Sequence, residues 1–215
     1  MMTAIDQMHV SGELRSSEAM SRHTSWRVGG PADLFFVPGS PDDLAQFLRG
    51  LDTETPVFWL GVGTNLLVRD GGIRGVVIAA ARILRGIERV GEYHVRAGSG
   101  LPCTQLARQC LRWGLGPSEF FAGIPGTIGG ALAMNAGAHG GETWERVETV
   151  RTIDRSGEFH DRTPAEYEVG YRHVVGPGDE WFINALFRFE PDVAASRETL
   201  DAMLERRKTT QPLGL

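Results

Sequence analysis

The chain has 215 residues, of which 41% are hydrophobic and 23% are charged. This composition excludes a disordered tail and a fibre, and the length allows one large or two small domains. The net charge of −5 excludes a general nucleic-acid or anionic-membrane surface, because either needs a basic excess. Glycine is over-represented at 28 residues, nearly twice the roughly 7% average.

The longest apolar run and the cysteines indicate where in the cell the protein is located. Residues 76–81 form that run, which is far shorter than the roughly 18 residues that span a bilayer. The first twenty residues lack the apolar segment of a secretory signal. Cys103 and Cys110 lie in a segment with helical spacing, roughly 10 Å apart and beyond disulfide reach. We therefore expect a cytoplasmic protein with free thiols and no membrane insertion.

The N-terminal half begins with a polar stretch. Residues 1–22 are irregular in pattern, and we expect a loosely held lead-in there. The apolar run 33–37 predicts a buried strand. A helix follows, because Ser40 is suited to the N-cap and Pro41 to the first helical position. Further strands are predicted at 57–60 and 76–78.

Strands and helices mix without strict alternation in the second half, which favours an α+β fold over a doubly wound parallel sheet. The predicted elements are a strand pair around Gly91, a helix from Pro102 to Trp113, a hairpin of 147–153 with 158–160, a strand at 181–189 and a helix from 194 to about 207.

The first glycine loop, residues 61–66, follows a predicted strand with the sequence Gly-Val-Gly-Thr-Asn-Leu. Glycines in this place let backbone N–H groups approach a diphosphate. Leu66 replaces the third Gly of the dinucleotide fingerprint, and no helix pattern follows. A Walker loop is excluded because Lys208 is the only lysine of the chain. The loop is therefore either a phosphate site or a plain hairpin turn.

The second glycine loop, residues 123–130, leads into a predicted helix at 131–135. The N-terminal amides of that helix would face an anion. The alternative is that Gly129, Gly130 and Ala131 simply allow tight helix packing. Two such loops without a Walker lysine suggest a dinucleotide that is held by the backbone.

Five segments together resemble the UDP-N-acetylenolpyruvoylglucosamine reductase family, and they stand in the family's order. They are 23–33 (HTSWRVGGPAD), 61–67, 119–130, 135–138 (NAGA) and 170–172 (GYR). The resemblance implies two α+β FAD-binding subdomains with non-covalent FAD between them. Their expected limits are 23–82 and 83–192. Residues 193–215 would be a helix that leads to a substrate-binding domain absent from this chain.

The same resemblance implies the ligands and the reaction. NADPH would be the co-substrate, and the enolpyruvyl ether of UDP-N-acetylglucosamine would be reduced to UDP-N-acetylmuramate for peptidoglycan. The cofactor-binding residues would be Gly61, Gly63, Thr64, Asn65, Leu66, Gly123, Ile124, Pro125, Gly126, Thr127, Gly129, Gly130, Asn135, Gly137 and Ala138.

Arg172, next to Tyr171, resembles the family's catalytic arginine motif. Hydride addition to the enol ether drives negative charge onto the conjugated carboxylate, so a fixed cation is needed there. A guanidinium fork is suited to both carboxylate oxygens. Without the resemblance, a surface arginine would be the simpler interpretation.

The family's proton-donating serine and late glutamate have no counterpart in this chain. Gln211-Pro212-Leu213 resembles the run that leads toward that serine. We therefore expect the isolated chain to keep part of the FAD site and to turn over poorly. Arg206, Arg207 and Lys208 would either approach the substrate diphosphate or form a solvated helix end.

Two other functions remain open from the sequence: a non-catalytic FAD-binding module, and an FAD oxidase or dehydrogenase of the broader superfamily.

Glu119 matches a family position and would either cap a helix or contact the flavin. His139 lies in the glycine-rich region, but the six histidines show no metal-binding spacing. We expect a monomer without a metal site or a nucleic-acid partner.

Overall fold

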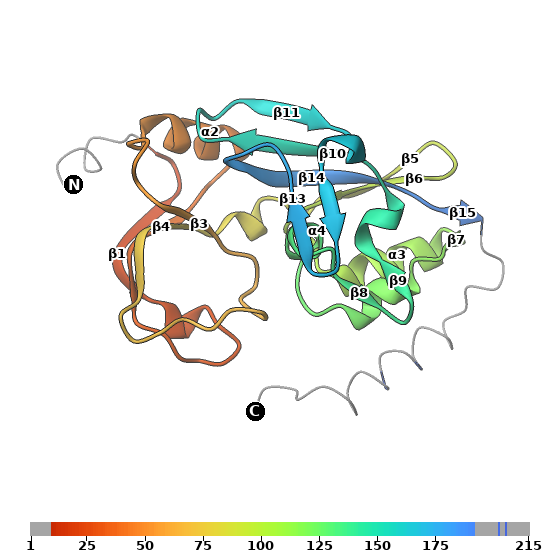
Figure 1. Ribbon diagram of the computed structural model, residues 1–215, viewed down its shortest axis with the longest axis horizontal. Coiled ribbons are helices and arrows are strands. Elements are labelled where there is room, and N and C mark those ends of the chain that lie inside the picture. Colours follow the sequence, from red (N-terminus) through yellow and green to blue (C-terminus); the bar gives the residue numbers. More distant parts are fainter. Residues whose placement is uncertain (1–9, 192–201, 203–204, 206–215) are drawn as a thin grey trace.

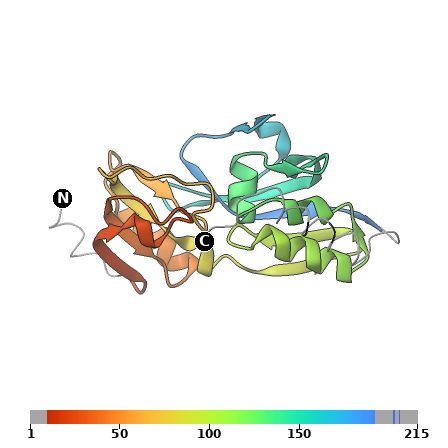
Figure 2. The same cartoon turned by 90° about the horizontal axis from the view of Figure 1, so that it is seen from below.

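The computed structural model describes residues 10–191 and, further along, Ala202 and Glu205. These residues form two lobes, each built on one main sheet (Figures 1 and 2). The predicted helix from 194 to about 207 lies outside the described residues, apart from Ala202 and Glu205, which are both helical. Residues 206–208 and 211–213 lie outside them as well.

The first lobe holds a four-stranded sheet in the order β1-β2-β4-β3. Its strands are β1 (Glu13–Ala19), β2 (Pro31–Val37), β3 (Val57–Trp59) and β4 (Ile73–Ile78). β1 is antiparallel to β2, whereas β2 and β3 both run parallel to β4. Helix α2 (Pro41–Gly50) packs on one face, where Phe47 stacks on Phe36 at 4.0 Å. As predicted, Ser40 caps α2 by accepting the Asp43 N–H at 3.1 Å.

The lead-in expected at residues 1–22 is wrong where the structure describes it. Residues 13–19 form β1, and Met20–Arg22 form a 3-10 turn, η1. The strand has few apolar residues because it lies at the sheet edge and its charges pair with one another. Glu18 is buried, accepts a hydrogen bond from Arg15 and pairs with His23. A polar edge strand of this kind carries no hydrophobic alternation for sequence reasoning to detect.

The second lobe holds a five-stranded antiparallel sheet in the order β11-β10-β14-β6-β5. Its strands are β5 (Ile87–Val90), β6 (His94–Gly98), β10 (Val147–Asp154), β11 (Phe159–Arg162) and β14 (Glu180–Arg188). The predicted strand pair around Gly91, the 147–160 hairpin and the strand near 181–189 are confirmed. Helices α3 (Cys103–Arg112) and α4 (Ile128–Ala133) and the turn η3 (Glu119–Gly123) pack around Phe121 and Phe187.

Short elements complete the described chain. They are η2 (Ala80–Arg82), β7 (Leu115–Gly116), β8 (Gly137–Ala138), β9 (Gly141–Glu142), η4 (Thr143–Arg146), η5 (Pro164–Glu166), β12 (Glu168–Gly170), β13 (His173–Val175) and β15 (Glu190–Pro191). Cys103 and Cys110 are buried and form no disulfide, as predicted, and burial raises the pKa of Cys110 to about 12. No helix in the described part of the chain is long and apolar enough to cross a membrane.

The β10–β11 turn docks the second lobe onto the first. Arg155 Nη1 donates to the Thr55 carbonyl at 2.9 Å. Gly157 has φ +75, and a Cβ there would lie 2.4 Å from the Ala45 carbonyl oxygen in α2. Trp59 of β3 also stacks on Trp181 of β14, with ring centroids 5.6 Å apart. These contacts fix the separation of the two sheets.

Replacement of Gly157 by Ala tests this docking. Gly91 is the matched control, because it also has a positive φ (+65) but no atom within 4 Å of the position that a Cβ would take. Both variants carry the cost of a left-handed alanine, about 1 kcal/mol. We expect Gly157→Ala to lower the free energy of unfolding by at least about 1 kcal/mol more than Gly91→Ala. Equal losses in urea denaturation would show that the turn does not press on α2.

Candidate flavin site between the two lobes

A cavity of about 940 Å³ lies between the lobes, and both glycine loops line it. Its volume is in the range of small-molecule and cofactor sites, about 300–1,000 Å³. The predicted site residues that line it are Gly61, Gly63, Thr64, Asn65, Leu66, Gly123, Ile124, Pro125, Gly126, Thr127, Gly130, Asn135, Gly137, Ala138, Tyr171 and Arg172. Segments more than a hundred residues apart in the chain are thus brought to one site.

The first glycine loop leaves the end of β3 and packs against the segment 23–25, which follows η1. Gly63 has φ +69, and a Cβ there would lie 1.9 Å from the His23 carbonyl oxygen. The Ser25 N–H donates to the Gly63 carbonyl at 3.0 Å. The amides of residues 61–65 have no hydrogen-bond acceptor among the described residues. These donors are therefore available to a ligand in the cavity.

The second glycine loop differs from its prediction in one respect. Helix α4 begins at Ile128 rather than at Ala131. Its first two amides are not available, because Ile128 N–H donates to the Leu101 carbonyl and Gly129 N–H to the Ser99 carbonyl, at 2.9 and 2.7 Å. The expectation that the helix N-terminus faces an anion is therefore wrong for these two groups. Gly129 instead lines a neighbouring cavity of about 180 Å³.

Other amides of the second loop remain without a partner. Those of Gly126, Thr127 and Gly130 have no acceptor within the described ranges. The two loops also face each other closely: a Cβ on Gly61 would lie 3.0 Å from Thr127 Oγ1. A Cβ on Gly126 would lie 3.1 Å from Thr64 Oγ1. Backbone donors from both lobes therefore converge on one region, which is the arrangement a diphosphate requires.

Arg172 lies at the turn of the β12–β13 hairpin and lines the same cavity. Its backbone is left-handed, with φ +51. The guanidinium has no ion-pair partner in the part of the chain that the structure describes. Tyr171 beside it is 84% exposed. An unpaired guanidinium at the cavity can bind a carboxylate or a phosphate of a ligand.

Several residues of the cavity wall were not predicted. Glu142 and Glu145 line it together with His139. Glu142 N–H donates to the Glu145 carboxylate at 3.3 Å, within a capping box that starts η4. A carboxylate does not attract an anionic ligand, so the expectation of a diphosphate site did not point to these residues. Glu119 does not line the cavity; it accepts the Ser118 N–H at 2.8 Å.

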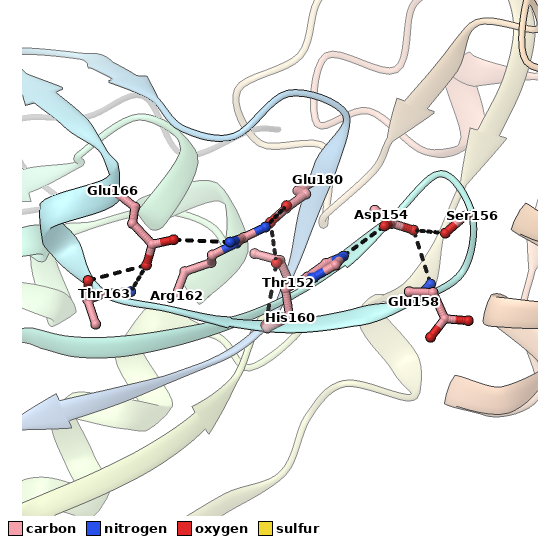
Figure 3. A network of polar contacts seen from close by, with 9 residues as sticks. All are labelled: Thr152, Asp154, Ser156, Glu158, His160, Arg162, Thr163, Glu166 and Glu180. Carbon is pink, nitrogen blue, oxygen red and sulfur yellow. Dashed lines mark hydrogen bonds and ion pairs between the residues drawn. The ribbon is translucent and has the colours of Figure 1, made fainter.

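A polar network joins β10, β11 and β14 to η5, which leads into the hairpin of Arg172 (Figure 3). Arg162 pairs with Glu180 of β14 and with Glu166 of η5. At the other end, Asp154 accepts hydrogen bonds from Ser156 Oγ at 2.7 Å and from the Glu158 N–H at 3.0 Å. Burial alone would raise the pKa of Asp154, but these bonds and the His160 ring outweigh it and hold the pKa at about 2.

Comparison with known proteins places this geometry in a family. Residues 32–162 match the family described as FAD binding domain. The cavity with its amide-bearing loops and this match define a flavoprotein that binds FAD. The predicted two-subdomain FAD-binding fold is thereby confirmed.

Two relatives identify the family more narrowly than the FAD-binding match does. The chain is 51% identical to UDP-N-acetylenolpyruvoylglucosamine reductase of Alkalilimnicola ehrlichii, over 99% of this chain and 72% of the relative. It is 55% identical to that of Methylococcus capsulatus, over 91% of this chain and 64% of the relative. The chain belongs to the UDP-N-acetylenolpyruvoylglucosamine reductase family, as the five segments indicated.

Two solved structures have a fold similar to that of this chain. The reductase from Thermus caldophilus superposes with a TM-score of 0.72 at 28% identity, over 94% of this chain and 70% of that one. The 6-hydroxy-D-nicotine oxidase from Arthrobacter nicotinovorans reaches 0.62 at 17% identity, over 86% of this chain and 43% of that one. The second likeness shows a shared fold alone.

Gly63→Ala tests the first glycine loop. The methyl group would meet the His23 carbonyl and force a left-handed alanine, so we expect an unfolding cost of at least about 2 kcal/mol and a loss of FAD retention. Gly71→Ala is the control, since nothing lies within 4 Å of its Cβ position and it is not among the glycines with positive φ. Thermal unfolding and flavin absorbance of the reconstituted variants measure both effects. Retention of FAD by Gly63→Ala at the level of Gly71→Ala would contradict this view of the loop.

Acidification tests the network at Asp154. The folded pKa of about 2 lies below the ordinary value of 3.8, so Asp154 contributes stability above pH 3.8 that is lost as the pH falls through 2. We expect the denaturation midpoint to fall over this range, and to fall less in Asp154→Asn. Asp161→Asn removes one exposed carboxyl from the same hairpin and is the charge-matched control. An unchanged pH slope in Asp154→Asn would refute the role of the network.

Proposed function

We propose that this chain forms the FAD-binding part of a UDP-N-acetylmuramate dehydrogenase. In this reaction NADPH is consumed and the enolpyruvyl ether of UDP-N-acetylglucosamine is reduced to UDP-N-acetylmuramate, a precursor of peptidoglycan. One observation supports the proposal most: the unpaired guanidinium of Arg172 and two loops of unpaired amides line one cavity in the described part of the chain. The chain spans 72% and 64% of the two relatives compared above, so the activity is proposed for the protein as a whole.

The residues of the cavity fit FAD. Amides of residues 61–65 and of Gly126, Thr127 and Gly130 would donate to the diphosphate, with the hydroxyl groups of Thr64 and Thr127 close by. Bound FAD supplies the hydride chemistry, while the protein supplies orientation and electrostatics. Since Lys208 is the only lysine of the chain, oriented backbone dipoles take the place of a lysine at the phosphates.

In this proposal Arg172 acts on the enolpyruvyl substrate. Reduction of the enol ether shifts negative charge onto the carboxylate conjugated to it. A guanidinium fixed at that carboxylate would stabilise this charge through two parallel hydrogen bonds. The Tyr171 side chain, exposed beside it, would help to define the same end of the cavity. We also propose that the protein is a monomer and works in the cytoplasm. Cys103 and Cys110 are buried and form no disulfide, which supports a reducing compartment.

An FAD titration of the purified chain tests the cofactor part of the proposal. We expect one FAD per chain, measured by isothermal titration and by the absorbance of the chain after removal of free flavin. We also expect FAD to raise the thermal unfolding midpoint, since a ligand that binds only the folded state stabilises it. The absence of saturable FAD binding by a folded chain would contradict the proposal.

Arg172→Lys and Arg172→Ala test the role of the guanidinium. In the whole protein, with flavin reduced by NADPH under anaerobic conditions, we expect the enolpyruvyl substrate to restore flavin absorbance about 10²–10³-fold more slowly in Arg172→Ala. Arg172→Lys should fall between, because an ammonium group lacks the fork geometry. Arg85→Ala, an exposed arginine away from the cavity, is the control. Equal rates in Arg172→Ala and Arg85→Ala would exclude Arg172 from the reaction. The substrate affinity read from the flavin spectrum gives the same comparison without turnover.

A further inference from the structure

The hairpin that carries Arg172 is not part of either main sheet. β12 and β13 pair only with each other in the described part of the chain, as a two-stranded sheet. Figure 1 shows this hairpin beside α4, projecting away from the long strands of the second lobe. Its position relative to the cavity therefore has to be set by contacts other than sheet hydrogen bonds.

Aromatic packing holds the base of the hairpin. Tyr167, just before β12, packs on Trp144 with ring centroids 4.6 Å apart. Gly176, just after β13, lies so close to Tyr167 that a Cβ would be 2.2 Å from its ring. The two ends of the hairpin are thus anchored on one stack. This contact does not reach the turn, where Arg172 lies.

Asn135 contacts the hairpin close to its turn. Its Nδ2 donates to the Gly170 carbonyl at 3.3 Å, two residues before Arg172. The same Nδ2 donates to Glu142 Oε2 at 2.7 Å, and Oδ1 accepts the Trp144 N–H at 3.1 Å. The residue is only 5% exposed and has φ +40. Both ends of the carboxamide are therefore used within the protein.

Few side chains can make this set of bonds. An aspartate lacks both donors and would place its charge against the Glu142 carboxylate and the Gly170 carbonyl. A left-handed backbone favours Asn and Gly over most other residues. Removal of a partner from a buried hydrogen bond to a charged group is costly, because the remaining group stays desolvated. The site requires a short amide at position 135.

We propose that Asn135 is a positioning residue for Arg172, and not a ligand of the cofactor. By holding the Gly170 carbonyl, it keeps the hairpin turn at the cavity, and through Glu142 it ties that turn to the β9–η4 segment. Asn135 was expected to bind the cofactor because segment 135–138 is one of the five that resemble the family. The proposal rests on the proposed function only for the role of Arg172.

Trypsin cleavage after Arg172 in the FAD-free chain reports the position of the hairpin directly. Cleavage after Arg85, an exposed residue outside the helices and strands of the same chain, is the internal reference. In Asn135→Asp we expect cleavage after Arg172 to rise about tenfold relative to Arg85, because the turn opens more often. In Glu142→Gln the bond from Asn135 can persist, and both the cleavage ratio and the unfolding midpoint should stay near those of the parent chain.

The double variant separates positioning from general stability. In Asn135→Asp with Glu142→Gln, the amide introduced at position 142 can donate to the carboxylate introduced at position 135, whereas the Gly170 carbonyl still lacks the donor that Asn135 provides. Asn135→Asp alone should lower the unfolding midpoint, because its carboxylate faces that of Glu142. In the double variant we expect the midpoint to return toward that of the parent chain while the Arg172 cleavage ratio stays raised. Recovery of both together, or an unchanged ratio in Asn135→Asp, would overturn the proposal.

Asn135→Gly keeps the left-handed backbone without strain and removes the whole amide. It should show the raised ratio even if Asn135→Asp does not accumulate as a folded protein, and a parental ratio in a folded Asn135→Gly would also overturn the proposal. Since none of these measurements needs flavin or turnover, failure of FAD binding and failure of this inference are distinguishable.

Discussion

Backbone amides without a partner among the described residues are the feature on which the site depends. Such groups are costly unless they face water or a ligand. Here they occur on two loops that approach each other from different lobes, at residues 61–65 and around Gly126. Glycine allows the main chain to come this close, as at Gly63 beneath the His23 carbonyl. A chain with a net charge of −5 and a single lysine can thereby still offer a site for a diphosphate.

The donors are useful only if the lobes keep their separation. The β10–β11 turn packs on α2 through Gly157, and Arg155 bonds the backbone before β3. Trp59 and Trp181 stack across the junction of the two sheets. The hairpin of Arg172 is then placed against the second lobe by the Trp144–Tyr167 contact and by Asn135. Rigid docking of the lobes and local anchoring of the hairpin thus bring amides and guanidinium to one cavity.

Local chemistry in the sequence was sufficient for several elements. The Ser40-Pro41 pair located the start of α2, and alternation around Gly91 located β5 and β6. The glycine loops and Arg172 came from family-like segments. The residues assigned to the cofactor or to catalysis all line the cavity except Gly129, and Glu119, weighed as a flavin contact, does not line it. Their contact with FAD stays a prediction at the level of single residues.

What the sequence could not reveal depends on contacts between distant segments. β1 is polar because Glu18 and Arg15 pair at a sheet edge, so it has no strand pattern. The start of α4 is shifted because the Leu101 and Ser99 carbonyls take its first amides. The partners of Asn135 are likewise distant, as the Gly170 carbonyl lies 35 positions further along the chain. Each of these differences reflects tertiary hydrogen bonding that no local pattern records.

Hydrogen–deuterium exchange of the chain with and without FAD tests the central claim most directly. If the unpaired amides hold the diphosphate, FAD will slow exchange in both glycine loops, at residues 61–65 and at Gly126, Thr127 and Gly130, and will leave the exposed turn at Gly91 unchanged. Stoichiometric FAD binding with no protection in either loop would contradict the account.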